Sequence, residues 1–169
     1  MSSAGIAAHL RDILILPFSV VVVVPYFLYD HHDDRILANI FFTILGLFLG
    51  CAGMFLFFYT VFLFKKIGKG TLAPWSEKQQ LVVVGPYRYC RNPMISGVLF
   101  IIIAEALMLH SLSILIWAGC FFVINTIYFI VSEEPALEKK FGADYKQYKQ
   151  QVSRWLPRAK PYPQHPSGA

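Results

Sequence analysis

Four apolar runs separated by polar segments dominate the chain, and this pattern predicts a helical membrane protein. The runs cover residues 13–29, 36–64, 94–109 and 112–131. Each is close to the roughly 20 residues that a helix needs to cross the hydrocarbon core of a bilayer. Pro17 and Pro25 fall in the first run, so we expect it to be kinked or broken near its ends. That run is too long for a cleavable signal, and no small-residue cleavage site follows it.

The polar segments differ in charge. Between the first two runs lies the acidic stretch DHHDDR, which we interpret as a solvated turn rather than a metal site. The segment between the second and third runs is basic, with Lys65, Lys66, Lys69, Lys78, Arg88 and Arg91 against Glu77. Seven basic and four acidic residues follow the fourth run. Basic loops stay in the cytoplasm, so we expect a multi-pass protein with both termini cytoplasmic. The short loops favour a prokaryotic inner membrane.

Composition agrees with the membrane assignment. Of the 169 residues, 56% are hydrophobic and 15% are charged, whereas soluble proteins carry about a quarter charged residues. The net charge of +5 is concentrated in the loops beside the apolar runs, so we expect no nucleic-acid partner. Three cysteines, two of them in apolar runs, give neither a disulfide framework nor a zinc-binding spacing. We expect no metal site.

The C-terminal part reads as an amphipathic surface helix on the membrane or capping the bundle. One apolar stripe with helical spacing consists of Leu137, Phe141, Tyr145, Tyr148, Val152 and Trp155. Gly142 is a candidate break within this helix, and Asp144 a candidate cap for its second part. Beyond Pro157 the chain is proline-rich. We expect one domain over residues 1–160 and a disordered tail over 161–169.

Residues 81–97, LVVVGPYRYCRNPMISG, combine turn formers and basic residues at the edge of an apolar run. Gly85-Pro86 indicates a turn, and Asn92-Pro93 is a favourable start for the third apolar helix. The free N–H groups of that helix start, beside Arg88 and Arg91, suit an anion such as a carboxylate or phosphate. The alternative is a juxtamembrane loop whose arginines meet lipid headgroups.

Three acidic side chains also carry hypotheses. Glu133 and Glu134 end the fourth apolar run and suit a cationic ligand group, or else form a solvated helix end. Adjacent helical residues point about 100° apart, so we expect one of the two to reach any given ligand. Glu105 lies within the third run and should face the bundle interior, where Asn125 is a candidate hydrogen-bond partner.

Three segments together resemble the isoprenylcysteine carboxyl methyltransferase family, a group of membrane methyltransferases that includes phospholipid N-methyltransferases. They are GTLAPW at residues 70–75, LVVVGPYRYCRNPM at 81–94 and EEPALEKKFGADYKQYKQQVSRWLP at 133–157. The family-like core therefore covers residues 70–157. The resemblance implies an all-α bundle of about four transmembrane helices with a cytoplasmic C-terminal amphipathic helix. It also implies methyl transfer from S-adenosylmethionine, with S-adenosylhomocysteine as product, to a lipid or prenylated acceptor.

The resemblance carries over to individual positions. The positions that match the family's cofactor contacts are Val82, Gly85, Tyr87, Arg91, Asn92 and Gly97, with Glu133 or else Glu134 toward the cofactor's amino group. For chemistry, one of Glu133 and Glu134, with Glu134 as the first choice, is a candidate to assist deprotonation of an amine acceptor. Arg154 or Arg158 is a candidate to orient a carboxylate acceptor. The chain departs from the commoner family pattern at Asn92 and Ile95, which puts the identity of the acceptor in question.

Two other functions fit the same features. A membrane reductase of the sterol-reductase type would bind a nicotinamide cofactor and would need additional basic residues for its 2′-phosphate. A lipid-binding or scaffold protein would have kept the architecture without the chemistry. Binding of S-adenosylmethionine, of the nicotinamide cofactor or of neither distinguishes the three.

Overall fold

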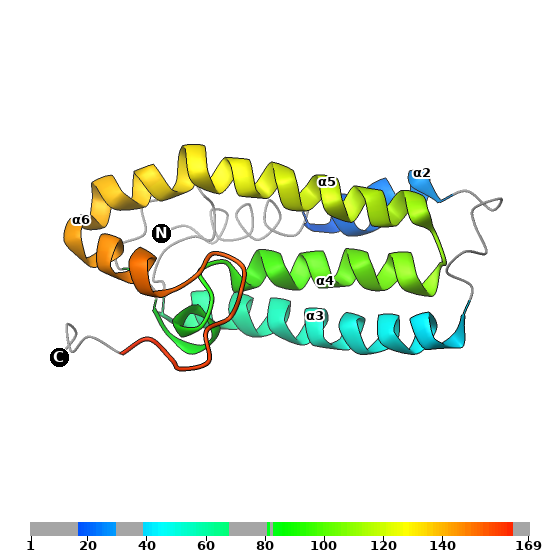
Figure 1. The fold of residues 1–169 in the computed structure, drawn as a ribbon, viewed down its shortest axis with the longest axis horizontal. Helices are drawn as coiled ribbons and strands as arrows, with labels where there is room; N and C mark the ends of the chain where they lie inside the picture. Colours follow the sequence, from blue (N-terminus) through cyan, green and yellow to red (C-terminus); the bar gives the residue numbers. More distant parts are fainter. Residues whose placement is uncertain (1–16, 30–38, 68–80, 82, 164–169) are drawn as a thin grey trace, which may run out of the picture.

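The computed structural model describes residues 17–29, 39–67, 81 and 83–163, with the side chains of 64–67 excepted. The described chain is helical and contains no strand. In order, the elements are η1 (Ser19–Val23), α2 (Val24–Leu28), α3 (Ile40–Ile67), η3 (Gly85–Arg88), α4 (Pro93–Met108), α5 (Leu112–Tyr128), η4 (Phe129–Glu133) and α6 (Glu134–Gln151). Helices α3, α4 and α5 run side by side along the long axis, and α6 bends across one end (Figure 1). The predicted helical bundle is confirmed.

Two described helices are long and apolar enough to cross a membrane. They are Ile40–Leu63, within α3, and the continuous helix Leu112–Gln151, whose apolar part ends at Val131 before the polar sequence of α6 begins. The other two predicted runs correspond to shorter apolar helices, Ser19–Leu28 and Pro93–Met108. A 16-residue helix such as α4 extends about 24 Å, less than the about 30 Å of a bilayer core.

Glycines allow α3 and α4 to pack with their backbones in close contact. A Cβ atom added at Gly53 would lie 2.8 Å from the carbonyl oxygen of Gly97, and one at Gly97 would lie 3.0 Å from the backbone nitrogen of Phe57. At Gly46 an added Cβ would lie 3.0 Å from the carbonyl oxygen of Ala104. Small residues at helix contacts are typical of membrane bundles, because apolar lipid supplies little hydrophobic force to hold helices together.

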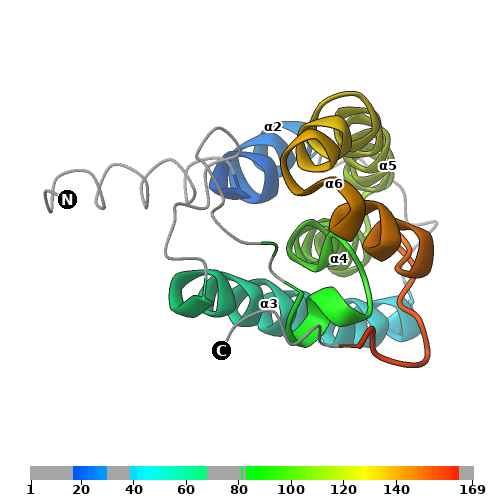
Figure 2. The same ribbon diagram turned by 90° about the vertical axis from the view of Figure 1, so that its left-hand side faces the viewer.

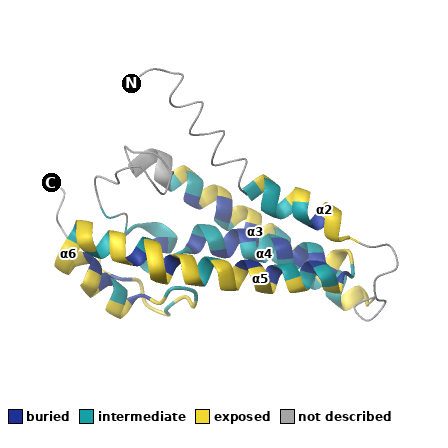
Figure 3. Cartoon of the chain, turned by 90° about the horizontal axis from the view of Figure 1, so that it is seen from above, coloured by how far each residue is buried: buried dark blue, intermediate teal, exposed yellow. Residues whose placement is uncertain are grey.

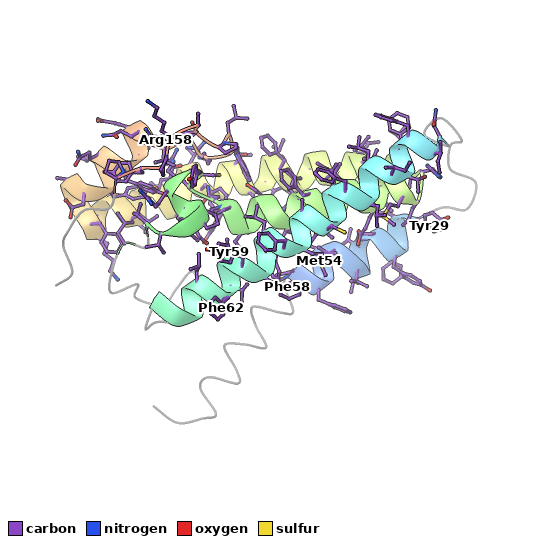
Figure 4. All side chains as sticks on the ribbon, turned by 90° about the horizontal axis from the view of Figure 1, so that it is seen from below. Tyr29, Met54, Phe58, Tyr59, Phe62 and Arg158 are labelled. Atoms are coloured by element: carbon purple, nitrogen blue, oxygen red, sulfur yellow. The ribbon has the colours of Figure 1, made fainter. Side chains whose placement is uncertain are left out.

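The core lies between α3, α4 and α5, and the outer faces carry exposed apolar side chains (Figure 3). Ile102 and Ile114 are fully buried at its centre. On α3, by contrast, Met54, Phe58 and Phe62 lie on an outward face (Figure 4). A soluble protein would bury such side chains, so this face is suited to lipid.

A π-helical turn precedes each of two prolines. The N–H of Val24 bonds to the carbonyl of Ser19 just before Pro25, and the N–H of Glu134 bonds to that of Phe129 just before Pro135. Proline has no N–H to continue the α-helical pattern, and a π turn accommodates this locally. The irregularity expected in the first apolar run thus takes the form of a wider turn near Pro25.

One predicted contact inside the bundle is wrong. Asn125 does not pair with Glu105, because its side-chain amide donates to the carbonyl of Phe121 in its own helix at 2.8 Å. Glu105 Oε2 is buried and has no hydrogen-bond partner among the described residues. The connection between α4 and α5 is short: Ser111 is the N-cap of α5, and its side chain accepts from the N–H of Ile114.

The expected break in the C-terminal helix is present at Gly142. Its backbone angles, φ 56° and ψ −124°, are non-helical and lie in a region that glycine adopts readily. The turn redirects the second half of α6 across the end of the bundle, as the end-on view shows (Figure 2). Tyr145, Tyr148 and Val152, three residues of the predicted apolar stripe, are buried there.

Candidate functional site

The turn formed by η3 holds the start of α4 against α3. Gly85 has φ +54°, and a Cβ atom at this position would lie 2.7 Å from the side chain of Leu63. The next residue, Pro86, starts the short 3-10 helix, and Tyr87 within it is buried. Glycine is therefore needed at position 85 both for the backbone conformation and for the close approach to α3.

Helix α4 begins as the sequence indicates, with Asn92 at the N-cap and Pro93 at the first helical position. The side chain of Asn92 forms no capping hydrogen bond. The backbone carbonyl of Asn92 accepts from both the N–H and the hydroxyl of Ser96, each at 3.0 Å. The first N–H groups of α4 are left without side-chain capping by Asn92. Such a helix start attracts anions through its free N–H groups and its dipole.

Glu134 is the centre of a cluster of three basic side chains, and we call Arg91, Glu134, Lys149 and Arg154 the Glu134 cluster. Oε1 of Glu134 lies 2.8 Å from Arg91 Nη1 and 2.7 Å from Arg154 Nε, and Oε2 lies 3.0 Å from Lys149 Nζ. Only 4% of Glu134 is exposed. The cluster joins the segment before α4 to α6 and to the chain that follows α6.

The cluster keeps the Glu134 carboxyl ionised. Burial alone would raise its pKa, but the hydrogen bonds from Arg154 and Lys149 and the charge of Arg91 outweigh burial. The pKa of Glu134 is therefore below its ordinary value of 4.5. A carboxylate with a low pKa and three cationic donors is a poor proton acceptor. Its contacts favour a role in holding Arg91 and Arg154 over the base role considered from the sequence.

Glu133, the neighbour of Glu134, lies on a different face of the helix. Burial is the main cause that raises the pKa of Tyr87 well above its ordinary value, and the charges of Tyr148 and Glu133 add to it. Glu133 is thus close enough to η3 to affect Tyr87, and it is less buried than Glu134. The two carboxylates therefore have different neighbours in the structure, Glu134 the three basic side chains and Glu133 the region of Tyr87.

The chain after α6, residues 152–163, returns along η3. We call it the C-terminal segment. Its backbone pairs with that of the turn: the N–H of Arg91 donates to Ser153, that of Arg158 to Tyr89 and that of Tyr162 to Arg88. The N–O distances are 3.0, 3.0 and 2.9 Å. The predicted disordered tail therefore does not include Tyr162, which is buried; residues 164–169 lie outside the described residues.

Two buried side chains fix this arrangement further. The Cys90 thiol donates to the carbonyl of Arg154 at 3.1 Å, and burial raises the pKa of this thiol. The hydroxyl of Tyr148 donates to the carbonyl of Tyr87. Tyr148 also packs edge-on against Tyr162, with ring centroids 5.4 Å apart. Arg154 reaches Glu134 from a backbone that Cys90 holds in place.

The predicted site residues are brought together in part. Arg91, Glu134 and Arg154 are in direct contact, and Tyr87 and Glu133 lie beside them. Gly97 is not at the cluster, because its open side is occupied by α3. Val82 and the GTLAPW motif lie outside the described residues.

Sequence reasoning missed four residues of this region: Cys90, Lys149, Tyr148 and Tyr162. Tyr148 belonged to the predicted apolar stripe, but nothing indicated that its hydroxyl would reach the turn. Lys149 is one helical position after Tyr148 and carries a further contact, 2.8 Å to Glu138. A buried cysteine or tyrosine whose partner is a backbone carbonyl has no sequence pattern of its own.

The donors present fit a cofactor that carries a carboxylate. Nε of Arg91 is buried and has no hydrogen-bond partner among the described residues, although Nη1 of the same guanidinium binds Glu134. A buried unpaired donor is costly, so this nitrogen is suited to an anionic oxygen. The described residues contain no group of three or more His, Cys, Asp or Glu side chains that could hold a metal ion.

The fold and the Glu134 cluster define a helical membrane protein with a charged site at one end of its bundle. A family model described as phospholipid methyltransferase matches residues 41–144. The chain belongs to this family and is a membrane methyltransferase of lipid-type substrates. An uncharacterized protein of Haemophilus influenzae is 42% identical over 65 residues, 37% of this chain and 100% of that protein. No solved structure matches the chain significantly.

Proposed function

We propose that the protein transfers a methyl group from S-adenosylmethionine to a lipid-borne acceptor beside the Glu134 cluster. The observation that carries the proposal is the contact of Arg91 with Glu134, which brings the start of α4 against the start of α6. Donors for an anion and carboxylates for a cation are thereby placed at one end of the bundle. S-adenosylmethionine carries a carboxylate and an ammonium group, so its binding site requires both kinds of protein group.

Arg91 would bind the cofactor's carboxylate through Nε, together with the first N–H groups of α4. Glu133 would accept hydrogen bonds from the ammonium group, with Gly85, Tyr87 and Asn92 lining the site. Val82 is a further proposed contact. Gly97 would contribute indirectly, because it sets the distance between α3 and α4. When bound, S-adenosylmethionine supplies an activated methyl group on a positively charged sulfur. The protein's contribution is to position the two reactants and exclude water.

Glu134 would act as a positioning residue. By holding Arg91 and Arg154 at 2.8 and 2.7 Å, it fixes both guanidinium groups relative to the helix starts. Arg154 binds Glu134 through Nε, which leaves the two terminal nitrogens to orient an acceptor carboxylate or phosphate. For an amine acceptor the headgroup proton must leave first, and Glu133 is the better candidate to accept it.

The protein would be a multi-pass protein of a prokaryotic inner membrane with both termini in the cytoplasm. Supporting this are the two long apolar helices and the basic segments beside the Glu134 cluster. The cluster would then lie at the cytoplasmic face, where both the cofactor and lipid headgroups are available.

Calorimetry with S-adenosylmethionine and, separately, NADPH tests the cofactor. We expect S-adenosylmethionine and S-adenosylhomocysteine to bind and NADPH not to bind. Arg91→Gln should weaken binding at least tenfold, about the effect of one charge-assisted hydrogen bond. Glu138→Gln, which changes a carboxylate outside the proposed site, is the matched control. Full binding by a folded Arg91→Gln variant would exclude the assignment, and binding of NADPH instead would favour a reductase.

Transfer of a radiolabelled methyl group into a total lipid extract plus a prenylcysteine analogue tests the reaction. An alkali-labile product indicates a methyl ester, and a methylated headgroup indicates an amine acceptor. Cofactor binding without any labelled lipid would contradict a lipid acceptor. Binding of neither cofactor would favour a non-catalytic lipid-binding protein.

A further inference from the structure

The C-terminal segment contacts the apolar helix α5 through Trp155. The indole N–H of Trp155 donates to Thr126 Oγ1 at 3.1 Å, and its ring lies 4.9 Å from that of Phe122 between centroids. Phe122 and Thr126 lie in the apolar part of the long helix Leu112–Gln151. Tryptophan with its ring on apolar groups and its N–H bonded is typical of the membrane–water interface.

The residue after Trp155 is an exposed leucine. Leu156 is 76% exposed, and the long helix Leu112–Gln151 carries the half-exposed apolar side chains Val123, Ile127 and Ile130. Those residues lie one helical position beyond Phe122, Thr126 and Phe129, the three that surround Trp155. An apolar side chain next to lipid-facing positions gains free energy by entering the acyl region.

The same part of the chain is purely basic. No acidic residue follows Asp144, whereas Lys146, Lys149, Arg154, Arg158 and Lys160 do. Lys149 and Arg154 are bound to Glu134, but Arg158 and Lys160 form no ion pair with any described residue. Nη1 of Arg158 is itself buried and has no hydrogen-bond partner among the described residues, whereas the residue as a whole is partly exposed. Its backbone is anchored on Tyr89, which fixes Arg158 at the α6 end of the molecule (Figure 4).

We propose that residues 155–160, the C-terminal tip, are a docking surface for an anionic phospholipid of the bilayer. Leu156 enters the acyl region beside α5, and Arg158 and Lys160 bind the lipid phosphate and headgroup. Charge complementarity selects an anionic lipid, because basic residues at a membrane surface are attracted to acidic headgroups. Lipid binding at this surface does not depend on methyl transfer, because none of residues 155–160 is a proposed contact of the cofactor.

Native mass spectrometry of the full-length protein in a neutral detergent tests this surface. The protein is titrated with phosphatidylglycerol or with phosphatidylcholine of the same acyl chains. We expect phosphatidylglycerol to bind about thirtyfold more tightly, the combined effect of two basic residues near an anionic surface. The double variant Arg158→Gln, Lys160→Gln should lose most of this preference. The double variant Lys139→Gln, Lys140→Gln, with the same charge change before Gly142, should keep it.

Leu156→Asp should weaken the binding of both lipids, since it removes the apolar contact shared by them. Equal binding of the two lipids by the wild-type protein would overturn the proposal, and this comparison requires no variant to fold. If the two double variants lost the preference for phosphatidylglycerol equally, the preference would be an effect of net charge alone. That result would also overturn the proposal. Displacement of the lipid by inorganic phosphate alone would indicate a free-anion site instead.

Discussion

Arg91 and Glu134 are 43 positions apart in the chain, yet Arg91 Nη1 lies 2.8 Å from Glu134 Oε1. Both side chains are largely buried, with 10% and 6% exposed. Ions are buried in proteins when they are paired and hydrogen-bonded, because an isolated buried charge is very costly. The pair therefore ties the segment before α4 to the start of α6, and several measurable consequences follow from it.

Glu134→Gln should lower the free energy of unfolding by about 3 kcal/mol, because it leaves buried Arg91 without its counter-charge. Glu138→Gln is the control, since Lys149, at 2.8 Å, is the only ion-pair partner of Glu138 among the described residues, and both side chains are about a third exposed. Its effect should stay below about 1 kcal/mol. Unfolding of both variants by titration with a denaturing detergent, followed by circular dichroism, measures the difference. Equal losses would show that Glu134 is not the centre of the cluster.

Stability should also depend on pH through Glu134. Its pKa in the folded protein lies below 4.5, so the unfolded state binds a proton at higher pH than the folded state does. The contribution of Glu134 is complete above pH 4.5 and is lost as the pH falls through the lower folded pKa. The difference in unfolding free energy between wild type and Glu134→Gln should therefore shrink from neutral to acidic pH. A difference that stays constant across that range would contradict the assignment.

Gly97→Ala should destabilise the bundle by about 1–3 kcal/mol, the usual cost of overpacking. The added Cβ atom would lie 3.0 Å from backbone atoms of Gly53 and Phe57, which cannot move like a flexible side chain. Gly119→Ala is the matched control in α5, because a Cβ atom there meets nothing within 4 Å. It should be neutral or stabilising by up to about 1 kcal/mol, since alanine is the better helix former. Thermal unfolding in one detergent compares the two, and similar effects would argue against close α3–α4 packing.

Cys90 should be unreactive in the folded protein. Its thiol is buried, donates to the carbonyl of Arg154 and has a raised pKa, and the thiolate is the reactive form. In a Cys51→Ser, Cys120→Ser background, maleimide should label Cys90 only after unfolding. A reference protein that also carries Cys90→Ser and the exposed thiol of Gln147→Cys should react at once in the folded state. Rapid labelling of folded Cys90 would mean that the C-terminal segment does not cover the turn.

Much of the architecture is determined by local sequence. Apolar runs long enough to span a bilayer have to be helical, since lipid offers no partner for backbone N–H and C=O groups. Pro93 after Asn92 marks the start of α4, because the fixed φ of proline suits the first helical position and its missing N–H is not needed there. Gly142 marks the bend in α6, because glycine adopts a positive φ that other residues disfavour. The sequence also places Arg91, Glu134 and Arg154 among the candidate site residues, the first two beside the ends of apolar runs and the third in the C-terminal part.

Only the tertiary structure decides what these residues do to one another. Glu133 and Glu134 are equivalent in the sequence, but the π turn before Pro135 and the packing of α6 direct Glu134 onto three cations. Gly97 packs against α3, Asn125 binds its own helix rather than Glu105, and Tyr162 is buried although it lies in a proline-rich tail. Each outcome depends on a contact between segments far apart in the chain. Such contacts follow from how the helices pack, and residue spacing does not encode them.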